Sequence, residues 1–98
     1  MSMELVGTIR FTAALLRHGS WGSHELGTHP SRMDLYLTPD RRRGAIEWDI
    51  PSLDQTEEIG LWFDEAGALV DYDGIMALPR QAVSIMRVYG LTVPEEFV

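Results

Sequence analysis

Apolar and polar residues alternate most regularly between residues 58 and 73, and a period of about two residues predicts a β-hairpin. Ile59, Leu61 and Phe63 share one face of its first strand. Residues 64–67, with the sequence DEAG, are typical of a turn, because glycine adopts the positive φ angles that tight turns need. The return strand is predicted over residues 68–72. The predicted cross-strand pairs, which form one apolar face, are Phe63 with Ala68, Leu61 with Val70, and Ile59 with Tyr72.

A helix is predicted after this hairpin, where the apolar residues take up helical spacing. Pro79 suits the first helical position, and Gly90 suits the residue just past the helix end. The predicted apolar stripe consists of Ala82, Val83, Ile85, Met86 and Tyr89. This stripe is expected to cover the apolar face of the hairpin.

Strand periodicity also predicts another hairpin earlier in the chain, over residues 33–50. The turn falls in residues 39–44, which break the alternation, and Pro51 ends the second strand. A polar connector, residues 51–57, leads to the later hairpin. The predicted inward face consists of Met33, Leu35, Leu37, Ile46, Trp48 and Ile50.

The N-terminal segment, residues 4–16, has two interpretations. Its odd positions are mostly apolar, which favours one long strand. The alternative ends the strand near Phe11 and makes residues 12–18 a short helical turn that stops at Gly19. Residues 18–32 are rich in glycine and have no usable period, so they are predicted to form a long connecting loop.

These elements predict an α+β fold in which residues 1–98 form a single domain. An N-terminal strand and two β-hairpins give an antiparallel sheet of four or five strands, and one C-terminal helix packs on one of its faces. The composition, 45% hydrophobic and 23% charged, is that of an ordinary globular protein.

The net charge of −7 opposes general binding to nucleic-acid phosphates. The chain has no cysteine, which excludes disulfides and thiolate metal sites. Its first residues lack the pattern of a signal peptide, and no stretch has the apolar length of a membrane span. We therefore expect a cytoplasmic protein that binds neither nucleic acid nor membrane.

Candidate catalytic and metal-binding residues are few. Ser20 and Ser23 lie near His18 and His24, but such proximity in sequence is common and no nucleophile-elbow or phosphate-loop motif accompanies it. With His29 and a carboxylate such as Glu25, these histidines could ligate zinc only if an aperiodic loop brought them together. Asp71 and Asp73 would share one side of a strand, and the basic run at residues 41–43 would form a solvated hairpin tip. No catalytic residue, metal site or cofactor is predicted, and a non-enzymatic role is favoured.

The sheet face away from the helix is the more informative candidate. Large apolar side chains at Tyr36, Trp62 and Leu69 are predicted there, among carboxylates. One interpretation is a protein-binding surface, and the other is a second small core under the long loop, to which Trp21 contributes. The predicted binding residues are Tyr36, Glu47, Asp49, Trp62, Leu69 and Asp71.

The function predicted from these features is that of a small acidic protein-binding module of the inhibitor, immunity or regulatory-subunit type. It would bind a protein partner, or a second copy of itself, through this sheet face. The alternative is a small enzyme, or a metal- or ligand-binding protein, that uses the loop of residues 18–32.

Overall fold

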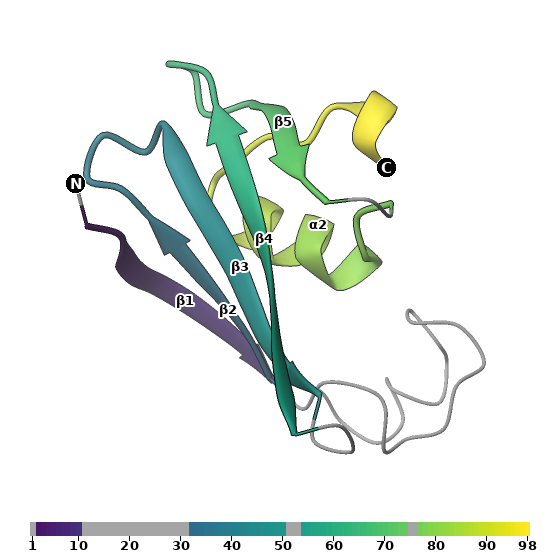
Figure 1. Cartoon of the computed structure of the whole chain (residues 1–98). Coiled ribbons are helices and arrows are strands. Elements are labelled where there is room, and N and C mark those ends of the chain that lie inside the picture. Colours follow the sequence, from purple (N-terminus) through teal and green to yellow (C-terminus); the bar gives the residue numbers. More distant parts are fainter. Residues whose placement is uncertain (1, 11–31, 51–53, 75–76) are drawn as a thin grey trace.

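The computed structural model describes residues 2–10, 32–50, 54–74 and 77–98, and within them the chain forms an antiparallel sheet and one α-helix (Figure 1). The sheet has five strands in the order β1-β2-β3-β4-β5, with α2 packed against one face. This arrangement confirms the predicted α+β class. The elements are β1 (Glu4–Arg10), β2 (Arg32–Leu37), β3 (Arg43–Ile50), β4 (Gln55–Phe63), β5 (Leu69–Asp73), α2 (Arg80–Val88) and a short 3₁₀ helix, η3 (Glu95–Phe97).

The hairpin formed by β2 and β3 has the predicted inward face. Leu35 pairs with Ile46 and Met33 pairs with Trp48, and all four side chains are buried. Alternation predicted this hairpin correctly because β2 and β3 pair without a bulge. The side chain of the sixth predicted member, Ile50, lies outside the part of the chain that the structure describes.

Helix α2 begins one residue later than predicted, at Arg80. Pro79 has extended backbone angles and is the N-cap residue, within the usual uncertainty of a helix boundary. Four of the five residues of the predicted stripe are buried, and the fifth, Tyr89, packs partly buried against the core. The buried members of the stripe are Ala82, Val83, Ile85 and Met86.

The predicted end of the helix at Gly90 is confirmed. Gly90 has a φ of +86°, the left-handed geometry in which a Cβ is disfavoured. The Leu91 N–H donates to the Met86 carbonyl at 2.9 Å, and the Gly90 N–H donates to the Arg87 carbonyl at 3.2 Å. These two bonds form a Schellman motif, which reverses the chain after the helix.

Two contacts hold α2 to the sheet near this reversal. The ring of Tyr89 occupies the space where a side chain on Gly7 of β1 would stand, so glycine at this position allows the close approach. The Arg41 Nη2 in the β2–β3 turn donates to the Tyr89 carbonyl at 2.9 Å. A guanidinium at a helix C-terminus also interacts favourably with the negative end of the helix dipole.

The register predicted for β4 and β5 is wrong. Phe63 pairs with Leu69 and not with Ala68, and a bulge follows, so that Leu61 pairs with Tyr72. Tyr72 stays on the core side as predicted, but Leu69 is only 1% exposed and Val70 is 53% exposed. The extra residue of the bulge reverses the side on which the next side chains fall.

The C-terminal segment accounts for this register. After α2 the chain returns beside the start of β5, where Ala68 forms a parallel bridge with Thr92. The Leu69 N–H donates to the Thr92 carbonyl at 2.9 Å, and the Thr92 N–H donates to the Gly67 carbonyl at 2.9 Å. These bonds fix the start of β5 from its outer side, which local alternation does not reveal.

Strand β1 also contains a bulge, which changes the predicted face of one residue. Leu5 pairs with Tyr36 and Gly7 pairs with Leu35, so Val6 is the extra residue. Leu5 was expected on the same face as Gly7 and Ile9, but it is 57% exposed. The choice between a long strand and a helical turn at residues 12–18, and most of the predicted loop, lie outside the described residues.

Removing the ring of Phe63 should destabilise the fold. Phe63 is 2% exposed within the core, so Phe63→Ala is expected to lower the free energy of unfolding by about 3–5 kcal/mol through the cavity it leaves. Chemical denaturation measures this loss. The exposed Val70→Ala in the same hairpin is the control and should change stability by about 0.5 kcal/mol or less. A loss below about 1 kcal/mol for Phe63→Ala would contradict its central place in the core.

Gly90→Ala tests the end of the helix. A Cβ at Gly90 would meet nothing within 4 Å, so the expected loss of about 1 kcal/mol comes from backbone strain alone. Thermal melting measures it. Gly60→Ala is the matched control, because Gly60 lies in extended β4 and its added Cβ makes only ordinary contacts, the nearest at 3.5 Å. Equal melting temperatures for wild type and Gly90→Ala would contradict a left-handed backbone conformation at residue 90.

Candidate functional site

The sheet face away from α2, called here the open face, follows from the core residues. Leu35, Ile46 and Leu61 point into the core, so their neighbours along each strand point to the opposite side. The open face carries Leu5, Thr8 and Arg10 from β1, Arg32, Asp34 and Tyr36 from β2, Arg43, Ala45, Glu47 and Asp49 from β3, Thr56, Glu58, Gly60 and Trp62 from β4, and Asp71 and Asp73 from β5.

Trp62 is the largest side chain of the open face and is half-buried. It lies directly between Arg43 on β3 and Asp71 on β5 in the cross-strand register. The guanidinium carbon of Arg43 is 5.2 Å from the centre of the Trp62 ring, a cation–π contact. The indole also extends along β4 over Gly60, because a Cβ there would lie 3.6 Å from Trp62 Cη2.

Tyr36 is the second aromatic group of this face and is also half-buried. Its direct neighbours are Leu5 on β1 and Ala45 on β3. Burial raises the pKa of the Tyr36 hydroxyl above its ordinary value of 10.0, and the nearby carboxylates of Glu47 and Asp34 raise it further. The open face is therefore a region of negative potential around Tyr36.

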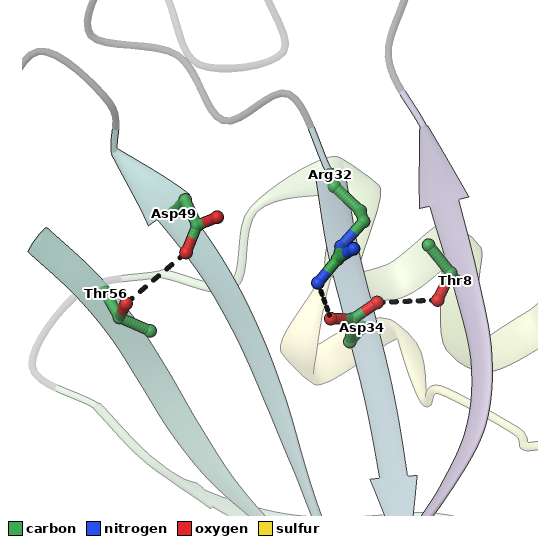
Figure 2. Close-up of polar contacts among 5 residues, drawn as sticks. All are labelled: Thr8, Arg32, Asp34, Asp49 and Thr56. Carbon is green, nitrogen blue, oxygen red and sulfur yellow. Dashed lines mark hydrogen bonds and ion pairs between the residues drawn. The ribbon is translucent and has the colours of Figure 1, made fainter. Parts of the chain in front are cut away.

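Asp34 is a buried carboxylate on this face, only 6% exposed. The Thr8 hydroxyl on β1 donates to its Oδ1 at 2.6 Å, and the Arg32 Nη2 lies 3.1 Å from its Oδ2 (Figure 2). Between β3 and β4, the Thr56 hydroxyl donates to the Asp49 carboxylate at 3.3 Å (Figure 2). Asp34 thus has the partners that a buried carboxylate needs.

A lateral row of carboxylates crosses the middle of the open face. Asp34 lies directly opposite Glu47, and Glu47 lies directly opposite Glu58. Within the described part of the chain, only Asp34 of these carboxylates has a hydrogen bond or an ion pair. Like charges that face each other across two strands destabilise a sheet.

Five of the six predicted binding residues lie on the open face: Tyr36, Glu47, Asp49, Trp62 and Asp71. The placement of Leu69 there is wrong, because the bulge in β5 turns Leu69 into the core. Sequence reasoning missed Glu58 and Asp73, although alternation from Ile59 and Tyr72 places both on this face. It also missed Leu5, which only the bulge in β1 brings beside Tyr36.

The three arginines of the β2–β3 turn are exposed, as predicted, but each makes a contact within the chain. Arg41 binds the end of α2 and Arg43 covers the Trp62 ring. The Arg42 Nε donates to the Phe63 carbonyl at 3.0 Å. This basic run therefore joins the turn to α2 and β4 and is more than a solvated tip.

A hollow of about 300 Å³ lies between the two hairpin turns and the end of α2. Two of the carboxylates that line it, Asp64 and Asp40, form hydrogen bonds within the turns. Asp64 Oδ1 accepts from the N–H groups of Ala66 and Ala68, each at 2.9 Å. The hydroxyl of Thr38 donates to Asp40, which lowers the pKa of that exposed carboxyl. The contacts of Asp64 and Asp40 therefore stabilise the two turns that line this hollow.

The histidines, serines and Glu25 considered for metal binding or catalysis, and Trp21, all lie outside the described residues. Among the residues that are described, no three His, Cys, Asp or Glu side chains are grouped in a way that could hold a metal ion. In the same part of the chain, no helix is long and apolar enough to cross a membrane.

No protein-family model, curated protein sequence or solved structure matches this chain.

The raised pKa of Tyr36 can be measured. Absorbance titration of wild type minus Tyr36→Phe isolates the Tyr36 hydroxyl, which is expected to ionise above pH 10.0. Glu47→Gln should move this pKa down, whereas the matched Glu95→Gln on η3 should not. The unfolded chain loses this proton at a lower pH than the folded one, so Tyr36 contributes to a loss of stability as pH rises above about 10. Ionisation at or below pH 10.0 would contradict the negative potential around Tyr36.

Proposed function

We propose that this protein is a small acidic, non-enzymatic protein-binding module of the inhibitor, immunity or regulatory-subunit type. It acts in the cytoplasm by surface complementarity, through the open face of its sheet. The observation that carries the proposal is that two half-buried aromatic side chains, Trp62 and Tyr36, lie among carboxylates on one face of the sheet.

The composition of this face supports the proposal. Protein-binding hot spots are rich in Trp, Tyr and Arg, and they are surrounded by polar groups that exclude water when the partner binds. Trp62, Tyr36 and Arg43 supply those residue types on adjacent strands. Leu5, which is exposed beside Tyr36, extends the apolar surface to the β1 edge.

The partner is a different protein chain. Two copies meeting through the open face would bring the same carboxylates together, since carboxylates outnumber guanidinium groups there. The carboxylates are Asp34, Glu47, Asp49, Glu58, Asp71 and Asp73, and the guanidinium groups are those of Arg10, Arg32 and Arg43. Such like-charge contact opposes self-association through this face.

Trp62→Ala tests the proposal. Stability should fall by only about 1 kcal/mol, because the side chain is half-buried and loses mainly its contact with Arg43. Binding should weaken by about 2 kcal/mol or more, as for loss of a hot-spot anchor. Wild-type protein is used to capture partners from the source cell, and a captured protein is identified, purified and titrated against both forms by calorimetry.

The control is Val88→Ala, which removes an exposed apolar group from α2 and should leave binding unchanged. If Trp62→Ala instead unfolds the chain, and the fluorescence of Trp62 itself, taken as wild type minus Trp62→Phe, is blue-shifted and protected from quencher, Trp62 belongs to a second core and the proposal fails. Equal affinities of wild type and Trp62→Ala for the partner would also reject it. Sedimentation that reveals a dimer lost in Trp62→Ala would replace the foreign partner by a second copy.

A further inference from the structure

We infer that the partner segment that docks on the open face is cationic and places an arginine or lysine side chain between the Trp62 indole and the carboxylates of Glu47 and Glu58. This inference rests on the proposed function and adds the chemical class of the partner. The positions are set by the sheet register: Gly60 separates Trp62 from Glu58 along β4, and Ala45 lies directly opposite Gly60. The indole itself extends over Gly60, and no other long side chain of β3 or β4 stands between the ring and the two carboxylates among the described residues.

The first observation that supports this inference is a pair of carboxylates, Glu47 and Glu58, that lack a positively charged partner among the described residues. Glu47 and Glu58 face each other directly across β3 and β4, and neither has a hydrogen bond or an ion pair within the described residues. Asp34, on the other side of Glu47, is already neutralised by Arg32. A cation brought by a partner would remove the repulsion between Glu47 and Glu58, and so would bind more favourably than at an isolated carboxylate.

The raised pKa of Tyr36 reflects the effect of the same carboxylates on a neighbouring side chain. After its burial, Glu47 and Asp34 are the largest causes of its raised pKa, and Glu58 adds to them. Among the described residues, three carboxylates thus raise the pKa of Tyr36, and Arg32 opposes them. The net potential around Tyr36 attracts a positive group.

The contact between Arg43 and Trp62 shows that the indole accepts a guanidinium. The two residues are direct cross-strand neighbours, with the guanidinium carbon 5.2 Å from the ring centre. Arg43 is exposed and has no ion pair in the described part of the chain, so no carboxylate there holds its guanidinium on the ring against displacement by a partner's cation. Arginine is the better fit of the two cations, because its planar group stacks on aromatic rings.

The probe is a short, end-blocked oligo-arginine peptide, titrated into ¹⁵N-labelled protein at physiological salt and followed by NMR. Saturable shifts are expected at the Trp62 indole N–H and at the backbone of residues 45–47 and 58–60. The same peptide with citrulline in place of arginine keeps the shape but not the charge, and it should bind at least about tenfold more weakly.

The matched variants are Glu47→Gln with Glu58→Gln, and Glu95→Gln with Glu96→Gln on η3, which change the net charge equally. The first pair should weaken peptide binding about tenfold while leaving thermal stability unchanged or higher, because it removes a like-charge pair. The second pair should stay within about twofold of wild type. Equal weakening in both double variants, equal binding of the citrulline peptide, or no saturable shifts at the open face would each overturn the inference.

Failure of this inference is separable from failure of the proposed function. If the peptide does not bind at the open face but Trp62→Ala still abolishes binding of the captured protein, the module binds protein and only the cationic class is wrong. The peptide could instead bind as expected while the captured protein has the same affinity for Trp62→Ala and for wild type. In that case the proposed docking site is wrong, although the open face attracts cations.

Discussion

The packing of α2 and the C-terminal segment against one side of the sheet is the interaction on which the rest of the structure depends. This packing buries Leu35, Ile46 and Leu61, and through strand alternation it decides which side chains are left on the other side. Apart from Leu5, which a bulge in β1 places there, the members of the open face follow from the residues that the core buries. A change of register that moved Trp62 inward would bring Leu61 or Phe63 out of the core, at a cost of several kcal/mol.

The chain reversal at Gly90 also helps to set the register of β5. Because Gly90 takes a left-handed conformation, Leu91 enters the core and Thr92 reaches the backbone of Gly67 and Leu69. Those hydrogen bonds hold the start of β5 in a register that buries Leu69 and places Asp71 opposite Trp62. A glycine after the helix thus helps to position a residue of the candidate site on a distant strand.

The α+β class, the β2–β3 hairpin and the end of the helix at Gly90 could be predicted from the sequence, because each depends on local signals. Alternation, turn residues and the special conformations of glycine and proline act over a few neighbouring residues. Alternation predicted the wrong sheet face for Leu69 and Leu5 for the same physical reason. Each strand contains a bulge, and its extra residue reverses the face of the side chains on one side of it. The bulge in β5 accompanies pairing with Thr92, a contact from far along the chain that a local pattern does not contain.

Electrostatic repulsion on the open face gives a physical reason to connect the site with function. A sheet selected for stability alone would have an arginine or lysine at one of these two paired positions, Glu47 and Glu58, because opposite charges on directly opposed residues stabilise a sheet. Instead, the cation nearest to Trp62, Arg43, stacks on the indole and leaves both glutamates without a partner among the described residues. Proteins retain such local conflicts mainly where function requires them. A partner that supplies a positive charge would remove the repulsion between Glu47 and Glu58. The relief of that repulsion would make the free energy of binding more favourable.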